Sequence, residues 1–347
     1  MVMVAGCGQF SYYLQAAHGQ FSLMSAARPI DTWLSDPTAD DELKAKLARV
    51  KDIRRFAADE LGLPDNASYT SYADLGRPYA LWNVVATPEF DMEPINWCFP
   101  VAGCVKYRGY YSKHEAKKFA DKLRQQGYDV QIDGVPAYST LGWFDDPVLS
   151  TFINYSDGEV ARLVFHELAH QVVYAKNDSQ FNESFAVAVE EESLDRWIAA
   201  SGDSEARRKY AERVGRKKDF VELLMRHRAA LEAIYASDLS VMEKRERKQQ
   251  VFQVLKDEYQ IIKTQRWHGH AGYDRWFEQP ISNAHLASIA TYHDLVPGFR
   301  ALLKQEKDFP AFFHKVRKLA ALSKDERHQV LAELGGEGTS RLASAEQ

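Results

Sequence analysis

Two histidines with a glutamate beside the first stand in the segment HELAH at 166–170. In a helix, His166 and His170 lie one turn apart on the same face, so both side chains can bind a single ion. Glu167 lies next to the first of these ligands, where its carboxylate can reach a water molecule on the ion. This H-E-x-x-H pattern therefore predicts a zinc site with an adjacent general base.

Apolar residues flank the motif on both sides, in ARLVF (161–165) and QVVYA (171–175). We expect the helix to be buried, and uncompensated polar groups in a buried helix cost several kcal/mol. The alternative is an amphipathic helix whose histidines are satisfied by hydrogen bonds. Ser156 and Glu159 have the spacing of a capping box, which predicts where this helix begins.

A catalytic zinc site needs a third protein ligand and an open position. Glu183 opens the next helical segment, after a tight turn at 176–178 that folds this segment back on the first. We therefore predict Glu183 as the third ligand. Glu190 lies two turns further along the same face, and its role stays open. It orients a histidine ligand, binds the amine of a substrate, or is part of a solvated surface.

The remainder of the chain must position these groups, and its pattern predicts an α+β protein with largely helical ends. β-branched and aromatic runs predict strands at 79–87, 104–111, 128–133 and 137–144. Helices are predicted at 12–27, 37–62 and 112–127, and the pattern from 204 to 333 is helical apart from a loop at 267–276.

These patterns divide the chain into five predicted parts. They are 1–7, the remnant of a lipoprotein signal; 8–78, an N-terminal helical segment; 79–202, an α+β catalytic core; 203–333, a C-terminal helical domain; and 334–347, a flexible tail.

The 347 residues carry a net charge of −5, which argues against a nucleic-acid-binding protein. Basic runs such as MEKRERKQQ alternate with acidic residues and predict solvated helix faces. No segment reaches the roughly 20 apolar residues of a membrane span.

The short apolar run before Cys7 resembles the end of a bacterial lipoprotein signal, in which this cysteine becomes lipidated. The charged region of such a signal is missing, so a truncated start and an accidental likeness both stay open. We expect a lipid-anchored protein of the bacterial cell envelope, or a cytoplasmic protein if Met1 is the true start. Cys98 and Cys104 are a disulfide pair in the first case and free thiols in the second.

Several blocks together are similar to a family of bacterial aminopeptidases, lipoprotein-like zinc peptidases related to the gluzincins. The blocks are YYLQAAHGQ, ARPI, FPVAGCVKYRGYY, AYSTLGWFDDP, FHELAHQ, FNESFA and YHDLVPGF. Gluzincins share H-E-x-x-H on one helix and an Asn-Glu pair on the next, matched here by Asn182 and Glu183. The chain departs from thermolysin-like enzymes at Val187, where they place an aspartate that orients a histidine, and in a shorter spacing between the second histidine and the glutamate.

The resemblance implies a gluzincin-like core, in which a small mixed sheet adjoins the H-E-x-x-H helix. It also implies an edge strand that pairs with an extended peptide. In this chain the expected strand comprises Tyr138, Ser139, Thr140, Leu141 and Gly142. A tyrosine or histidine from the C-terminal domain is expected to stabilise the oxyanion, and the candidates are Tyr292 and His293, with His285 behind them.

The predicted function is hydrolysis of peptide bonds with one zinc ion per chain, most specifically by an aminopeptidase. Glu167 would then take a proton from the zinc-bound water and pass it to the leaving amine. The alternatives are a zinc endopeptidase of the same fold and a non-catalytic envelope protein whose zinc joins two helices. The expected partners are peptide substrates and, through Cys7, a membrane, without an obligate protein partner.

Overall fold

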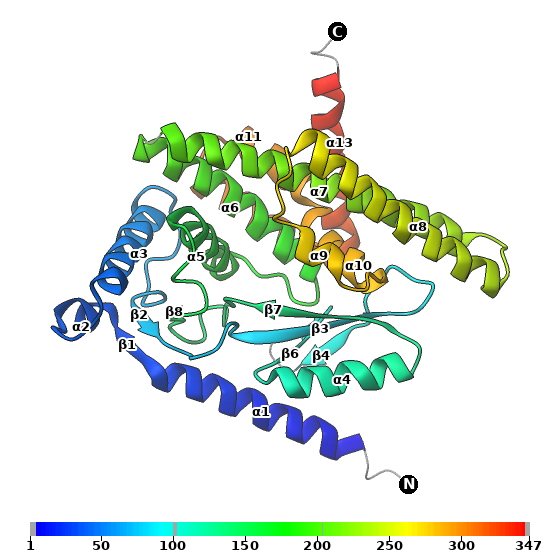
Figure 1. Cartoon of the computed structure of the whole chain (residues 1–347). Coiled ribbons are helices and arrows are strands. Elements are labelled where there is room, and N and C mark those ends of the chain that lie inside the picture. The colour runs from blue at the N-terminus through cyan, green and yellow to red at the C-terminus, as the bar shows by residue number, and fades with distance from the viewer. Residues whose placement is uncertain (1–4, 100–102, 203, 344–347) are drawn as a thin grey trace.

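The computed structural model describes residues 5–99, 103–202 and 204–343, and side chains from residue 12 onward except near the C-terminus. Cys7, the predicted lipidation site, lies outside the residues whose side chains are described. The fold is α+β, mostly helical, with a few short strands (Figure 1). None of the described helices has the length and apolar character of a membrane span.

The strands form three small sheets within the described residues. One is mixed and holds β1 (Ala27–Pro29), β2 (Ser71–Ala73) and β8 (Val148–Leu149), with β2 and β8 parallel. The second is antiparallel in the order β6 (Arg108–Tyr110), β3 (Leu81–Thr87) and β7 (Asp129–Val135). The third is a hairpin of β4 (Trp97–Phe99) and β5 (Gly103–Val105).

Helices cover both faces of the β6-β3-β7 sheet. On one face lies α4 (Lys113–Gln125), which begins at the predicted cap, where the backbone N–H of Glu115 donates to the hydroxyl of Ser112. Its small residues Ala116 and Ala120 pack on Trp82 and neighbouring strand residues. On the other face lies α10 (Asn283–His293), which also contacts α6, one of the two helices described below (Figure 1). The sheet thus supports α10 from beneath.

Two helices, α5 (Asp157–Val172) and α6 (Ser179–Ser201), carry the H-E-x-x-H motif and the predicted third ligand. The hydroxyl of Ser156 caps α5 by accepting from the backbone N–H of Glu159, as the sequence predicts. Residues 160, 161 and 163–170 are all buried, because α5 packs against α6 on one side and α3 on the other. The prediction that the H-E-x-x-H helix is buried is confirmed.

The other helices surround these two (Figure 1). The N-terminal part contains α1 (Ala5–Ala26), α2 (Ile30–Ser35) and α3 (Asp41–Asp59). The C-terminal part begins with α7 (Ser204–Ala236) and α8 (Val241–Ile261), a long pair followed by the π-helical turn η1 (Ile262–Arg266) and α9 (Asp274–Glu278). It ends with α11 (Val296–Glu306), α12 (Phe309–Ala320) and α13 (Lys324–Ala343).

Two sequence predictions about local structure are wrong. The stretch 137–144 is a loop and not a strand, because Leu141 and Gly142 adopt left-handed backbone conformations with φ of 57° and 78°. The predicted flexible tail is helical as far as Ala343. Here α13 packs closely against α11, at Gly298 of α11 and Gly335 of α13. A Cβ atom added at Gly298 would lie 2.2 Å from a backbone oxygen of α13, so this close approach requires glycine.

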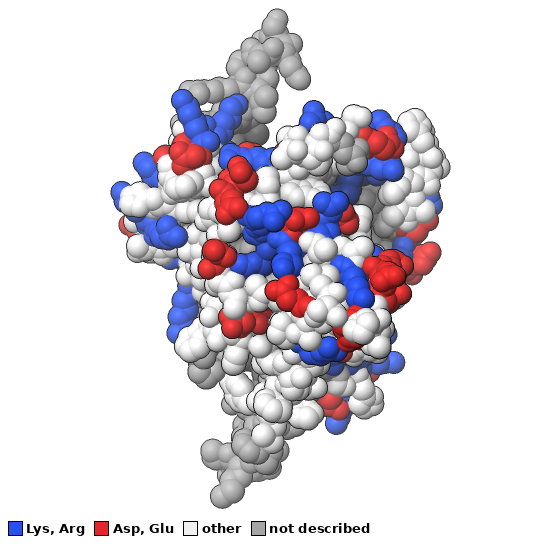
Figure 2. Space-filling view, turned by 90° about the vertical axis from the view of Figure 1, so that its left-hand side faces the viewer, with Lys and Arg blue, Asp and Glu red and all other residues white. Residues whose placement is uncertain are grey.

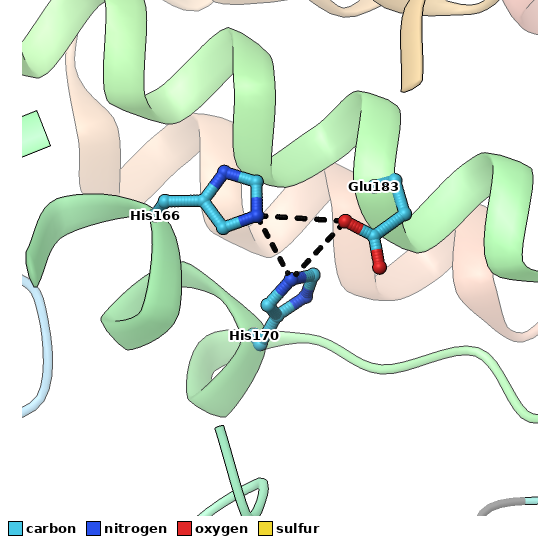
Figure 3. A group of neighbouring side chains, drawn as sticks. All are labelled: His166, His170 and Glu183. Carbon is cyan, nitrogen blue, oxygen red and sulfur yellow. Dashed lines mark hydrogen bonds and ion pairs between the residues drawn. The ribbon is translucent and has the colours of Figure 1, made fainter. Parts of the chain in front are cut away.

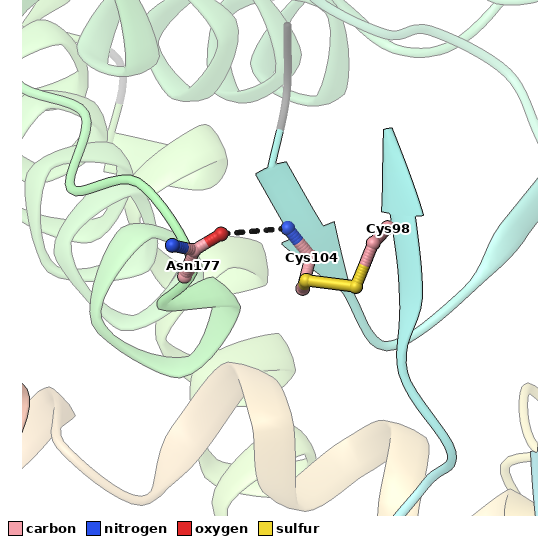
Figure 4. The surroundings of a disulfide bond; sticks show 3 residues. All are labelled: Cys98, Cys104 and Asn177. Carbon is pink, nitrogen blue, oxygen red and sulfur yellow. Dashed lines mark hydrogen bonds between the residues drawn. A yellow bond between two sulfur atoms is a disulfide. The ribbon is translucent and has the colours of Figure 1, made fainter. Parts of the chain in front are cut away.

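A disulfide joins Cys98 and Cys104 across the β4-β5 hairpin, the first of the two states that the sequence left open (Figure 4). The side chain of Asn177, in the turn between α5 and α6, points at this hairpin and accepts a hydrogen bond of 2.8 Å from the backbone N–H of Cys104. The disulfide-bonded hairpin therefore contacts the connection between α5 and α6.

Charged side chains of both signs alternate over the central and upper parts of the face shown in Figure 2, and the lower part carries few of them. Within α7, for example, Arg208 forms ion pairs with Glu205 and Glu212. The basic runs therefore lie on solvated, charge-balanced helix faces, as predicted.

Candidate metal centre

The predicted ligands His166, His170 and Glu183 converge on one point between α5 and α6 (Figure 3). The two histidine Nε2 atoms are 3.2 Å apart. Oε2 of Glu183 lies 3.4 Å from Nε2 of His166 and 3.6 Å from Nε2 of His170. Three ligand atoms from two separate helices thus form a compact triangle that could hold a metal ion.

The turn between the helices is fixed by Asn182, the residue before the third ligand. Its side-chain oxygen accepts a 2.7 Å hydrogen bond from the backbone N–H of Ala175, and its amide donates to the carbonyl of the same residue at 2.9 Å. Asn182 and Ala175 are both buried, so these two hydrogen bonds hold the connection between α5 and α6 against the first turn of α6. The Asn-Glu pair therefore combines a structural residue with a candidate ligand.

Glu190 lies behind the triangle and orients His166. Its Oε2 atom is 2.9 Å from Nδ1 of His166, the ring nitrogen that faces away from the triangle. A histidine that donates Nδ1–H to a carboxylate presents the lone pair of Nε2 to a metal ion. Arg162 and Lys217 also donate to this carboxylate, at 2.9 and 3.4 Å.

These contacts support the first role left open for Glu190, the orientation of a histidine. With an exposed fraction of 1% and three donors around it, this carboxylate has no free surface for the amine of a substrate, so the contacts argue against the second of the open roles, substrate binding. The carboxylate that orients His166 thus comes from Glu190, about one turn after Val187 on α6.

The cluster is electrostatically suited to a cation. Burial alone would lower the pKa of His166, but hydrogen bonds to Glu183 and Glu190 raise it to about 10. Burial alone would raise the pKa of Glu183, but His170 and His166 lower it to about 2. The carboxylates therefore stay ionised and attract one positive charge, either a proton or a metal ion.

Glu167 is buried next to the triangle, with an exposed fraction of 7%. Burial raises the pKa of its carboxyl, against the opposing charges of His166 and His170. A carboxylate with a raised pKa accepts a proton more readily near neutral pH, which is the property that a general base requires.

The three C-terminal candidates lie in different surroundings. The charge of Glu183 and then burial raise the pKa of Tyr292 well above its ordinary value, so its hydroxyl is near the triangle and stays protonated. Burial and the charge of Lys217 lower the pKa of His293 to about 4, against the opposing charge of Glu190. His285 is a helix cap, because its Nδ1 atom accepts from the backbone N–H of Ser282 at 3.1 Å.

The predicted substrate-binding residues 138–142 form the loop described above. The hydroxyl of Tyr138 bonds to Tyr111 at 2.8 Å and to Gln20 of α1, so its side chain joins the loop to the N-terminal helix. The backbone N–H of Thr140 donates to the carboxylate of Asp146 at 2.8 Å, which closes the loop. A peptide can pair with this loop only at its free backbone groups.

Sequence reasoning missed several groups around the triangle. Burial and the charge of Glu183 raise the pKa values of Tyr107 and Tyr174. Burial and the charge of Glu167 raise that of Tyr69. Arg162 could have been found, because it lies one helical turn before His166 on the same face. The tyrosines come from loops, and no local spacing identifies them.

A family model with the description "Putative aminopeptidase" matches residues 11–331. The chain belongs to this family. The matched range includes both metal-binding helices, the sheet and most of the C-terminal helices. The family's description indicates a peptidase, a hydrolase of peptide bonds. No curated protein and no solved structure matches the chain.

Proposed function

We propose that the protein is a zinc-dependent aminopeptidase of the gluzincin type. The observation that carries this proposal is the convergence of His166, His170 and Glu183, with the buried carboxyl of Glu167 beside them. Membership of the aminopeptidase family supports the reaction class. The ligand set of two histidines and one glutamate is the one that zinc peptidases of this type use.

The spacing of the donor atoms fits zinc. A zinc ion binds histidine nitrogen and carboxylate oxygen at about 2.0–2.1 Å in a tetrahedral arrangement, which requires ligand atoms about 3.3 Å apart. The three distances in the triangle are 3.2, 3.4 and 3.6 Å. Among the described residues, three donors meet here, which favours an open catalytic site over a closed structural one.

A bound zinc would supply an activated water molecule and polarise the carbonyl of the scissile bond. Glu167 takes the proton of the attacking water and transfers it to the amine that leaves. Glu190 keeps the ring of His166 in place during both steps through the bond to Nδ1. Burial of these side chains excludes bulk water and strengthens each charge interaction.

Of the two candidates for stabilising the oxyanion, Tyr292 is the better. The charge of Glu183 is the largest cause of its raised pKa, so its hydroxyl remains a proton donor at neutral pH. The pKa of His293 responds instead to the charges of Lys217 and Glu190, which pair with each other behind the triangle. A Tyr292→Phe variant should therefore lose activity, whereas His293→Gln should lose much less.

The decisive experiment compares a peptide that has a free amino terminus with the same peptide acetylated. An aminopeptidase releases the first residue of the free peptide and leaves the acetylated one intact. Cleavage of both peptides at internal bonds would instead establish an endopeptidase with the same zinc chemistry. If neither is cleaved by zinc-loaded protein, the structural-zinc alternative replaces the proposal.

A further inference from the structure

Tyr69 combines three features that are unusual for a core tyrosine. Its backbone is in the left-handed region, with φ of 61°, which is a rare and strained conformation for an aromatic residue. Its side chain is buried, with an exposed fraction of 2%. Its hydroxyl oxygen is completely buried, and no described group of the protein is hydrogen-bonded to it. Strain and an unsatisfied hydroxyl both lower stability, so packing alone does not explain this residue.

Hydrogen bonds on every side hold the backbone of Tyr69 in this conformation. Its N–H donates to the carbonyl of Asp146 at 2.6 Å. Arg54 donates to the carbonyl of the preceding residue, Ser68, whose hydroxyl accepts a 3.2 Å bond from the amide of Gln171. Asn66 donates to the same amide at 2.6 Å. The segment 66–69 is therefore attached to α5 at the residue directly after the ligand His170.

The segment 66–69 lies beside Glu167, because Gln171, to which it is bonded, is one turn further along α5 on the same face as Glu167. Burial raises the pKa of Tyr69 well above its ordinary value, and the charge of Glu167 is the strongest of the electrostatic causes, followed by that of Asp146. The carboxylate of Asp146 already accepts a hydrogen bond from Thr140. Glu167 is thus the better acceptor for a hydroxyl that remains protonated and can only gain by donating.

We propose that Tyr69 is a positioning residue, whose hydroxyl donates a hydrogen bond to the carboxylate of Glu167 when a peptide is bound. This inference rests on the proposed peptidase function. Hydrogen bonds of a catalytic base are often absent before the substrate binds and form in its complex. The bond would hold one oxygen of Glu167 and leave the other to take the proton of the attacking water. The strained segment 66–69 and its attachment to Gln171 would keep the hydroxyl within reach.

The test uses Tyr69→Phe, which removes one oxygen atom and keeps the ring. The expected result is a fall in kcat of about 10- to 100-fold, the usual effect of losing such a supporting bond, with KM changed less than about 2-fold. The zinc content should stay at the wild-type value. The thermal midpoint of the metal-free protein should rise, because the variant no longer buries an unsatisfied hydroxyl. Tyr72→Phe is the matched control: it is another buried tyrosine, its ring packs on Trp33, and it should leave kcat unchanged.

A double-mutant cycle with Glu167→Asp separates positioning from a general effect on the fold. If Tyr69 acts through Glu167, the two substitutions together should lower kcat far less than the product of their separate effects. An unchanged kcat in Tyr69→Phe, a loss of zinc, or fully multiplicative effects in the cycle would each overturn the inference and leave the proposed function intact. A wild-type protein that cleaves no peptide would overturn both.

Discussion

Replacing Glu190 with glutamine should weaken zinc binding without removing any ligand. The substitution keeps the size of the side chain but removes the charge that His166, Arg162 and Lys217 share. The amide can still accept from Nδ1 of His166, but as a neutral partner. Zinc affinity should therefore fall about 10- to 100-fold, the usual cost of losing the group that orients a histidine ligand.

The effect on stability follows from the exposure of the three partners. The contact with His166 is buried, and exchanging a charged for a neutral hydrogen bond there costs about 1–2 kcal/mol. Side chains of Arg162 and Lys217 are 25% and 30% exposed, so water can replace their partner and each contributes less than about 1 kcal/mol. The free energy of unfolding of the metal-free protein should thus fall by about 2 kcal/mol.

The assay is a competition titration of zinc against a fluorescent chelator, combined with urea unfolding of the metal-free protein. Glu192→Gln is the control, because this residue is on the same helix but is 38% exposed and pairs only with Arg196 among the described side chains. It should bind zinc like the wild type. If Glu190→Gln also binds zinc within about 3-fold of the wild type, Glu190 does not orient a ligand and this reasoning is wrong.

Three other variants test the surroundings of the site. Burial raises the pKa of Asp146 from 3.8 to about 6, so the folded protein keeps a proton that the unfolded chain loses, and stability falls as the pH rises through this window. Asp146→Asn should remove a pH-dependent loss of up to about 3 kcal/mol, seen as a flatter free energy of unfolding between pH 4 and 7. Asn182→Ala, which loses two buried bonds to Ala175, should destabilise the protein by about 2–3 kcal/mol in urea unfolding. Opening the disulfide of Cys98 and Cys104, which spans six residues, by a double substitution to serine should cost about 2 kcal/mol, and an unchanged mass of the wild type on reduction would show that the bond is absent.

The parts of the site that the sequence predicted are those set by local geometry. The spacing of four residues places His166 and His170 on the same face of any helix. The short turn at 176–178 reverses the chain, so Glu183 at the start of the next helix lies beside them. The support of Glu190 by Lys217 was not predictable, because Lys217 lies 27 residues later, on α7, and reaches Glu190 only through the packing of that helix.

The failures at 137–144 and 334–343 have tertiary causes. The first stretch is rich in strand-forming residues, but the hydrogen bond between Thr140 and Asp146 favours a closed loop. The second has the glycine content of a flexible tail, yet glycine is what permits α13 to approach Gly298 of α11. Composition indicates the conformation that an isolated segment prefers, whereas contacts with the rest of the protein determine the conformation of these two segments.

The most direct test of the account is the rate at which zinc-loaded Glu167→Gln releases the first residue of a peptide that the wild type cleaves. Glu167 is buried beside the ligands but is not one of the three donors that converge, so the variant should bind one zinc per chain. Loss of the general base should lower the rate about 100- to 10,000-fold. A variant that contains zinc and cleaves the peptide at the wild-type rate would contradict the proposed mechanism.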